Sequence, residues 1–494
     1  MSSEALPESP IEDAAAPTPA PAPSGARGRW IARLEEQGRY STFVMLAALA
    51  GMFAATFPIT ILASSLPLIA KELHTAETTM AWVLAAPMLT SAVALPLLGK
   101  LGDLYGHRRV FLLGSAAAAT TAFATCFAWN APSLIGCRTM AAMVGAATQP
   151  TAMALIFSVT PREERVRAMG WWSMTGAGAP MIGLVAGGPL VDWLGWRVIF
   201  AIQGALQLAA LTSASIILRE TVRQRVRLDV PGVATLALGV AGLMVALSAS
   251  SGHGLASPFV LGPLAFGVVL LAIFWRVEHR VAAPLLPPAL LRRRAFAAPL
   301  AANAFTSASY MGAFAIAPYL LKNEFGLSGA MVSWVLALRT ASYTFSSPAG
   351  GALGQRFGER TAAWVGCAGI AIAMAILSTA SRSSFLVGVC VGLVLQGIAY
   401  GLCTPSITTA ASNAGTEEEL GITSAVSRLM GSVGSAFGVT LLTLLYGGNG
   451  TADGFRTPFR AGGALAVAAL VASLAMRRER IGARVELPTL RELP

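Results

Sequence analysis

The sequence predicts an all-α polytopic membrane protein, and three observations support that fold class. The first is composition: of 494 residues, 55% are hydrophobic and 12% are charged, with a mean hydropathy of +0.65, whereas soluble domains carry about 25% charged residues. The second is a series of charge-free apolar runs of about 20 residues, the length that crosses the hydrocarbon core as a helix. The third is the alternation of arginine-rich and arginine-poor loops. Together they exclude a soluble enzyme and a disordered or collagen-like chain.

The apolar runs divide the chain into fourteen predicted transmembrane helices, with boundaries uncertain by about 2–4 residues. The predicted ranges are 42–70, 78–99, 110–129, 132–159, 168–192, 197–218, 230–250, 258–277, 296–321, 328–352, 361–379, 384–408, 419–446 and 459–476. Twelve or thirteen helices are the alternative if two short runs are re-entrant.

These helices are expected to form two bundles with an insertion between them. Residues 39–222 form the N-terminal six-helix bundle, 223–282 the inserted helices 7 and 8, and 283–476 the C-terminal six-helix bundle. Residues 1–38 contain the segment PTPAPAP and are predicted to be a disordered cytoplasmic tail, because such a composition cannot bury a core. No secretory signal precedes the first apolar run. Residues 477–494 are predicted to be a second cytoplasmic tail.

The basic residues predict the orientation in the membrane. The net charge is +11, and the arginines gather on alternate loops. The rich loops carry Arg108, Arg109, Arg162, Arg165, Arg167, Arg219, Arg223, Arg225, Arg227, Arg276, Arg280, Arg292, Arg293, Arg294, Arg356 and Arg360. By the positive-inside rule these loops and both termini are cytoplasmic. The charge thus predicts an inner (plasma) membrane protein beside anionic lipid, with no nucleic-acid partner.

The two halves repeat one pattern at a fixed spacing. Residues 82–85 and 334–337 both read WVLA, an offset of 252. The same offset relates Pro96 to Pro348, Gly99 to Gly351, Leu101 to Leu353, Gly102 to Gly354, Gly106 to Gly358 and Arg108 to Arg360. Paired repeats of this kind build secondary transporters.

Other classes of site are absent from the sequence. It contains no phosphate-binding loop of the type G-x-x-x-x-G-K-[ST], no HExxH and no nucleophile elbow, so neither an ATP-driven pump nor an enzyme is predicted. The five cysteines lie in apolar runs without a CxxC pair, so no metal site, disulfide framework or cofactor is expected.

The segment 99–109, GKLGDLYGHRR, resembles the signature loop between helices 2 and 3 of the major facilitator superfamily. Its defining positions are Gly99, Asp103, Gly106, Arg108 and Arg109, interpreted as a gating motif. The segment 351–360 resembles a weaker copy with Gln355 in place of the acid. Independently, a carboxylate at position 103 can accept from helix N-termini or nearby arginines. A plain solvated turn is the alternative.

Further positions resemble the fourteen-helix drug–proton antiporter group of that superfamily. Arg138 matches a buried arginine of helix 4, and Trp196 with Arg197 matches the start of helix 6. The resemblance implies alternating access between two bundles, a substrate near the midplane, and commonly export of lipophilic compounds against a proton gradient.

Two features depart from that group. The helix-5 motif, with Gly183, Gly187 and Gly188, has Leu184 where proline is expected, and simple helix packing explains its small residues equally well. The acid usual in helix 1 is also missing, because Pro58 stands at its position and no other carboxylate lies in mid-span. Proton coupling therefore rests on the resemblance alone.

Charged and polar residues within the spans are the candidate substrate-binding residues. Arg138 and Arg339 each cost about 2.5–3.5 kcal/mol at a helix centre, so either each faces a polar cavity or helix carbonyls and Gln or Asn neighbours satisfy it. The other candidates are Gln149, Gln203, Asn303, Tyr310, Gln396 and Tyr400.

Three functions fit these observations. The first is a secondary exporter of lipophilic drugs or metabolites. Its partners would be the substrate and, if transport is coupled, protons. The second is an organic-anion transporter with a positive central cavity. The third is a non-transporting membrane sensor or scaffold.

Overall fold

The computed structural model describes residues 26–75, 77–80, 82–221, 229–253, 256–281, 288–323, 325–379, 386–416, 419–446 and 452–476. Within these ranges all regular structure is helical, which confirms the predicted all-α class. Residues up to Tyr40 form one compact unit and residues from Ser41 onward form another. In the first unit, residues Ala26–Glu36 of the predicted N-terminal tail form helix α1. The rest of that tail, residues 1–25, and the predicted C-terminal tail, residues 477–494, fall outside the described ranges.

The N-terminal half begins with a broken helix. Helix α2 (Tyr40–Thr56) ends at Phe57, and α3 (Pro58–Glu72) starts with proline, which has no backbone N–H to give to the preceding turn. The remaining helices of this half are α4 (Glu77–Met80), α5 (Trp82–Tyr105), α6 (His107–Cys126), α7 (Ala131–Gly145), α8 (Thr148–Val159), α9 (Arg162–Leu194) and α10 (Trp196–Ile217).

Helices α11 (Val230–His253) and α12 (Pro258–Glu278) form a close pair. A Cβ atom at Gly242 would lie 2.8 Å from the Cα atom of Gly267, so only glycines permit this approach. Helix α11 also packs against α5 and α18, one from each half of the chain. The pair therefore borders both bundles.

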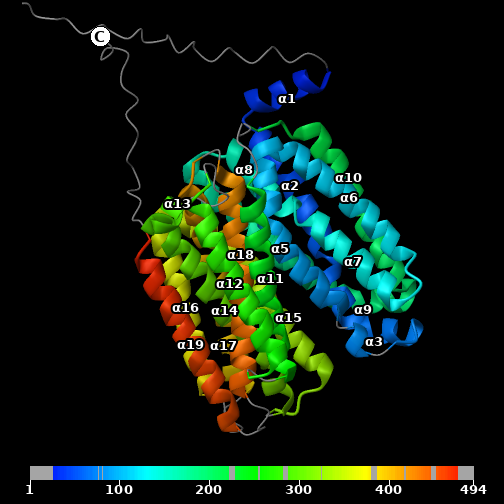
Figure 1. Cartoon of the computed structure of the whole chain (residues 1–494), viewed down its shortest axis with the longest axis vertical. Coiled ribbons are helices and arrows are strands. Elements are labelled where there is room, and N and C mark those ends of the chain that lie inside the picture. Colours follow the sequence, from blue (N-terminus) through cyan, green and yellow to red (C-terminus); the bar gives the residue numbers. More distant parts are fainter. Residues whose placement is uncertain are drawn as a thin grey trace, which may run out of the picture. The chain divides into compact units, whose positions relative to one another are not determined.

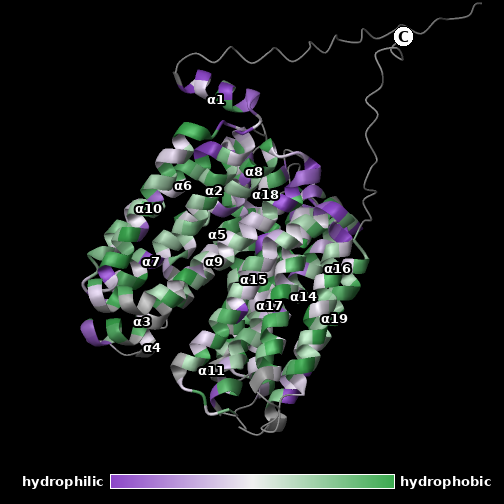
Figure 2. Cartoon of the chain, turned by 180° about the vertical axis from the view of Figure 1, so that it is seen from behind, coloured by the Kyte–Doolittle hydropathy of each residue, from purple (hydrophilic) through white to green (hydrophobic). Residues whose placement is uncertain are grey.

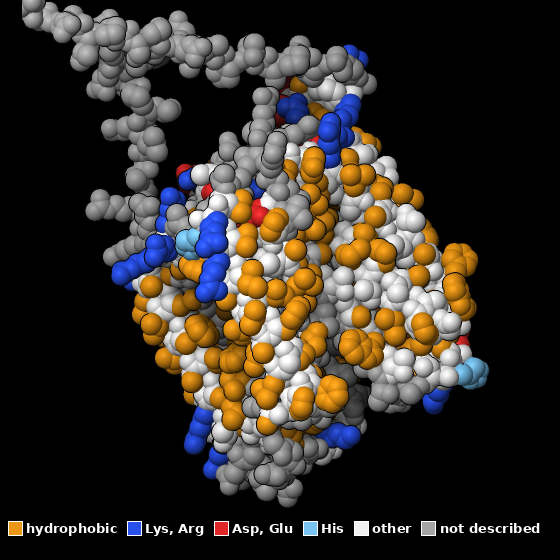
Figure 3. Space-filling view, viewed as in Figure 1, with side chains coloured by type: hydrophobic (Ala, Val, Ile, Leu, Met, Phe, Trp, Pro, Cys, Tyr) orange, Lys and Arg blue, Asp and Glu red, His pale blue; other side chains and the backbone are white. Residues whose placement is uncertain are grey.

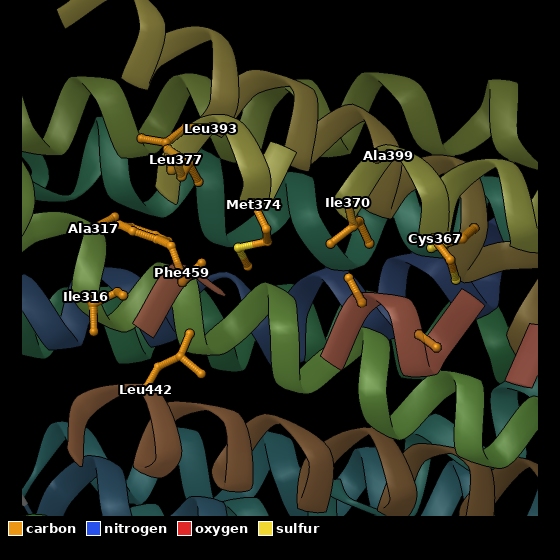
Figure 4. Packing of buried hydrophobic residues seen from close by; sticks show 14 of the residues in the cluster. Ile316, Ala317, Cys367, Ile370, Met374, Leu377, Leu393, Ala399, Leu442 and Phe459 are labelled. Carbon is orange, nitrogen blue, oxygen red and sulfur yellow. The ribbon is translucent and has the colours of Figure 1, made fainter. Parts of the chain in front are cut away.

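The C-terminal half consists of α13 (Pro288–Arg292), α14 (Arg294–Asn323), α15 (Gly329–Phe357), α16 (Glu359–Ser378), α17 (Leu386–Asn413), α18 (Leu420–Tyr446) and α19 (Ala452–Leu474). Figure 4 shows its apolar core, where Met374 and Ile370 of α16 lie among Leu393, Leu442 and Phe459 of neighbouring helices. This core holds α14, α16, α17 and α19 together as one body.

Each of the fourteen predicted ranges coincides with one helix or with a consecutive pair. Among the described residues, ten helices are long and apolar enough to cross a membrane. Helices α9 and α15 are not among these ten, and they pack against one another across the two halves, so part of their surface need not be apolar. The number fourteen stays a prediction. In Figure 3, hydrophobic side chains cover the middle of the visible face and Lys and Arg lie toward its ends.

Candidate functional site

The two halves meet at the end that carries the arginine-rich loops. A Cβ atom added at Gly99 of α5 would lie 2.8 Å from the carbonyl oxygen of Gly421 of α18. At the position 252 residues later, a Cβ atom at Gly351 of α15 would lie 2.8 Å from the Val166 oxygen and 3.1 Å from Gly170, both of α9. Figures 1 and 2 show the halves converging near α8 and α18, and Figure 2 shows them separated at the opposite end, near α3 and α11. The protein is thus closed at this end.

Asp103 fastens the closed end. Its carboxylate is buried and accepts hydrogen bonds from the backbone N–H groups of Gly421 (3.0 Å) and Ile422 (3.1 Å). These donors lie in the first turn of α18, where N–H groups have no partner within the helix and the dipole favours an anion. The imidazole of His107 lies 3.2 Å from the same carboxylate. Asp103 therefore joins α5 of one half to α18 of the other.

The predicted gating arginines contact residues of their own half. The Arg108 backbone N–H donates to Glu220 (3.0 Å), and its guanidinium donates to the carbonyl oxygen of Ser215 (3.0 Å). Arg109 lies 3.7 Å from the Glu220 carboxylate. Gly106 adopts a φ of +99°, which allows the sharp turn between α5 and α6. In the state described, this part of the motif ties the α5–α6 turn to the end of α10.

Arg165 connects the halves on the other side. Its guanidinium donates to the side chain of Asn413 (3.1 Å) and to the carbonyl oxygen of Phe157 (2.8 Å). Asn413 in turn donates to the carboxylate of Glu359 (3.2 Å). The second contact between the halves thus passes from a guanidinium through a neutral amide to Glu359, the first residue of α16.

A cavity of about 210 Å³ lies between the halves. Its lining residues are Met52, Thr56, Met169, Trp172, Ser173, Gly176, Asn303, Ser307, Tyr343, Tyr400, Thr404, Thr408, Arg428, Gly431, Ser432 and Ser435. We call this the central cavity. None of these residues carries a carboxylate, and two predicted binding residues, Asn303 and Tyr400, are among them.

The central cavity has two chemically different walls. The N-terminal half contributes Met52, Met169 and the indole of Trp172 together with the hydroxyl residues Thr56 and Ser173. The C-terminal half contributes hydroxyl groups, an amide and the guanidinium of Arg428. The polar wall is partly ordered by its own hydrogen bonds, since the Asn303 amide donates to the Ser427 carbonyl oxygen at 2.7 Å. A molecule with an apolar and a polar end matches this arrangement.

A second cavity, of about 260 Å³, lies within the N-terminal half. It contains three further predicted residues, Arg138, Gln149 and Gln203. Arg138 donates weakly to Gln203 (3.4 Å) and lies 5.2 Å above the Phe200 ring. Thr56 lines both cavities, so they adjoin at the break between α2 and α3.

The last three predicted residues form a cluster inside the C-terminal half. Arg339 donates to Gln396 (2.8 Å) and to the carbonyl oxygen of Tyr310 (2.6 Å), and its guanidinium lies 3.6 Å from the centre of the Tyr310 ring. Arg339 lines neither cavity. Its hydrogen bonds go to a glutamine and to a helix carbonyl oxygen, which is the second of the two alternatives predicted for the buried arginines. Tyr310 stacks on Tyr400 with ring centres 3.9 Å apart. The cluster therefore supports the polar wall from behind.

The remaining prediction concerns the helix-5 motif, and two buried acids lie on the inserted helix pair. Residues 183–188 are helical within α9, and Gly183 is buried, whereas the burial of Gly187 and Gly188 lies outside the description. Asp229 and Glu278 are buried at the ends of α11 and α12, away from the central cavity lining. Asp229 accepts from the Gly232 N–H (2.9 Å) and caps its helix.

Sequence reasoning missed Arg428, the cation of the central cavity. It lies within the predicted range 419–446, so the search that selected Arg138 and Arg339 could have found it.

The sequence pattern of the Major Facilitator Superfamily matches residues 48–275 and 299–491. The chain is 28% identical over 403 residues to the tetracenomycin C resistance and export protein of Streptomyces glaucescens, covering 81% of this chain and 75% of that protein. It is 26% identical over 416 residues to the multidrug transporter protein MdtP of Bacillus subtilis, covering 83% and 76%.

The fold is similar to the crystal structure of the human organic anion transporter MFSD10, with a TM-score of 0.64 and 16% identity over 88% of this chain and 99% of that one. That likeness concerns the fold alone. The first two relatives are named as export or multidrug transport proteins, and the family consists of transporters rather than enzymes. The chain is a membrane transporter that belongs to the Major Facilitator Superfamily.

Proposed function

We propose that the chain exports small amphipathic molecules across the plasma membrane by alternating access, with the central cavity as the substrate site. The observation that carries the proposal is the cavity between two halves that are fastened at only one described end. Such a cavity can open to either side of the membrane in turn if the contacts that close the halves shift from one end of the protein to the other.

The orientation of the cycle follows from the loops. The closed end carries the arginine-rich loops, so by the positive-inside rule it faces the cytoplasm and so do both termini. We infer that the state described faces the outside, the side on which substrate is released. Anionic lipid beside the same loops would favour this orientation.

Opening toward the cytoplasm requires specific contacts to separate. The Asp103 carboxylate must leave the Gly421 and Ile422 N–H groups, and Gly351 must move away from α9. The second cavity adjoins the central cavity and supplies a largely apolar extension for larger substrates, with Arg138 and three glutamines as its main polar groups.

Export is tested by reconstituting the full chain in vesicles and following tetracenomycin C, the compound named for one relative. We expect transport by the wild type and loss in Thr404→Trp, which fills the central cavity. Gly262→Trp is the control, because a side chain there meets nothing within 4 Å among the described atoms. Equal transport by both variants would contradict the central cavity as the site.

Coupling to protons is tested in the same vesicles. A proton-coupled exporter slows when the pH gradient is collapsed, whereas an uncoupled one does not. No described residue lining the central cavity has a carboxylate, so a proton carrier would have to lie elsewhere, for example at Asp229 or Glu278.

A further inference from the structure

The central cavity contains a cation without a counter-ion. Arg428 lies on α18, and none of the described residues accepts a hydrogen bond from its buried Nε. The lining of the cavity offers it hydroxyl and amide groups but no carboxylate among the described residues. The Tyr400 hydroxyl, one of the nearby groups, is already within 3.3 Å of the Ser307 hydroxyl.

This arrangement differs from that of Arg339 and Arg165, although Arg138 in the second cavity also has a buried Nε that no described residue accepts from. Arg339 is saturated by Gln396, a carbonyl oxygen and an aromatic ring. Arg165 donates to three oxygen atoms at the closed end. An unpaired charge inside a membrane protein is expensive and marks a substrate or ion pathway more often than a structural site.

We propose that Arg428 is the anion-binding group of the central cavity and that the transported substrates include amphipathic organic monoanions. The proposal rests on the proposed function and specifies the substrate class of the same site. A carboxylate, sulfonate or phosphate ester would complete the hydrogen bonds of the guanidinium, which matches such planar or clustered oxygens well.

The opposite wall specifies the rest of the ligand. Trp172, Met52 and Met169 supply the large apolar side chains of the N-terminal half, where the Thr56 hydroxyl already donates to the Met52 carbonyl oxygen. An aromatic or aliphatic body can pack there while the anionic group reaches Arg428. Because the two ends bind to different halves, such a ligand would bridge them.

The charge balance also supplies a driving force that needs no carboxylate. A bound monoanion cancels the charge of Arg428, so the loaded carrier crosses as a neutral unit and the empty carrier returns one positive charge. A membrane potential that is negative inside pulls that charge inward. Each 100 mV then supports an outward gradient of about fifty-fold.

The binding test compares two probes that differ in charge alone: 2-naphthalenesulfonate and 2-naphthalenesulfonamide. We expect purified wild type to bind the sulfonate at least about tenfold more tightly than the sulfonamide, as charge-assisted bonds would give. Arg428→Gln should abolish the preference, and Arg428→Lys should keep part of it. Arg276→Gln, an exposed arginine at the end of α12, is the matched control.

A second variant keeps the test valid if Arg428→Gln does not fold. Ser432→Asp places a carboxylate on the cavity wall one helical turn from Arg428, so it should remove sulfonate binding and leave sulfonamide binding. Equal affinity of the wild type for both probes, or an undiminished preference in either folded variant, would overturn the proposal.

Flux of the sulfonate from vesicles tests the charge movement. We expect a negative interior imposed with potassium and valinomycin to accelerate exit severalfold. A rate unaffected by the potential would overturn the proposed charge balance. Tetracenomycin C transport without any binding of the sulfonate would overturn the anion site alone, whereas absence of all transport would remove the proposed function itself.

Discussion

The two copies of the repeated loop hold the closed end in different ways. Both place a glycine, Gly99 or Gly351, against a helix of the opposite half, and both turn at a glycine with positive φ, Gly106 at +99° and Gly358 at +89°. Asp103 of the first copy binds the N-terminus of α18, whereas the second copy has Gln355 at that position. The shared glycines provide close packing, and the carboxylate adds a charged contact on one side only.

This difference indicates that the two copies of the loop stabilise the closed end by different interactions. Steric fit depends on shape and is the same in either copy. A carboxylate at a helix N-terminus gains electrostatic energy only while the contact is intact, so it stabilises the closed state and is lost when the halves separate. The first copy therefore sets how strongly the closed state is preferred.

Each half also contains a buried arginine, and replacing these two residues should give the largest difference in stability. Arg339→Gln would leave Gln396 and the Tyr310 carbonyl oxygen without a donor, at about 1–3 kcal/mol for each buried group. We expect the free energy of unfolding in detergent to fall by about 2–4 kcal/mol. Arg138→Gln should cost less than about 1 kcal/mol, because the hydrogen bond from Arg138 to Gln203 is long, at 3.4 Å. Similar losses in both would contradict the contrast.

The next effect tests the packing that the loops share. Gly99→Leu and Gly351→Leu should each disfavour the closed state by about 1–3 kcal/mol, because a side chain meets backbone of the opposite half. The measurement is labelling of Thr408→Cys from the arginine-rich side, in a background without native cysteines. Both variants should label at least about fivefold faster.

The control for that comparison is Gly136→Leu. A Cβ atom there meets nothing within 4 Å among the described atoms, so labelling should stay at the wild-type rate. If only one of the two loop variants accelerated labelling, the packing would not be equivalent in the two copies.

A smaller effect separates the loops. Asp103→Asn keeps the size of the side chain but removes its charge and one of its two acceptors. Since a charge at a helix N-terminus typically contributes up to about 1 kcal/mol, we expect Thr408→Cys labelling to rise by at most about fivefold. Gln355→Asn should change it by less than about twofold. An equal response would assign the difference to shape rather than charge.

Much of the fold could be predicted because it depends on local composition. The range 258–277 corresponds to α12 at Pro258–Glu278, since apolar runs and the prolines that begin or break helices are both visible in the sequence. The repeat correctly paired Gly99 with Gly351. The partner of Asp103 could not be assigned, because Gly421 is 318 residues away and contacts of that kind depend on how the halves dock.

The binding site was harder to predict for a related reason. A charge scan finds buried arginines but cannot tell which side of a helix faces a cavity. Arg339 is surrounded by its own half, whereas Arg428 faces the opposite half. That distinction depends on the rotation of α15 and α18 about their axes. The hydrophobic periodicity and composition of the sequence do not determine this rotation.

The smallest effect concerns the other end of the N-terminal half, where an ion pair holds α3 to α10 without joining the halves. Glu72 accepts from Arg197 and from the Trp196 indole (2.7 Å), and chiefly the bond from Arg197 lowers the pKa of the Glu72 carboxyl. A lowered pKa stabilises the folded state above the unfolded value of about 4.3, and this contribution is lost as the pH falls through the folded value.

We therefore expect Glu72→Gln to unfold more easily than wild type at pH 7, by less than about 1 kcal/mol because the pair is half exposed. The difference should disappear well below pH 4 and shrink in 1 M salt. Thermal unfolding in detergent at both pH values measures it. Labelling of Thr408→Cys should not change, because Glu72, Trp196 and Arg197 all belong to one half. Faster labelling would show that this end also controls the closed state, and the contrast between a fastened and an unfastened end would then be wrong.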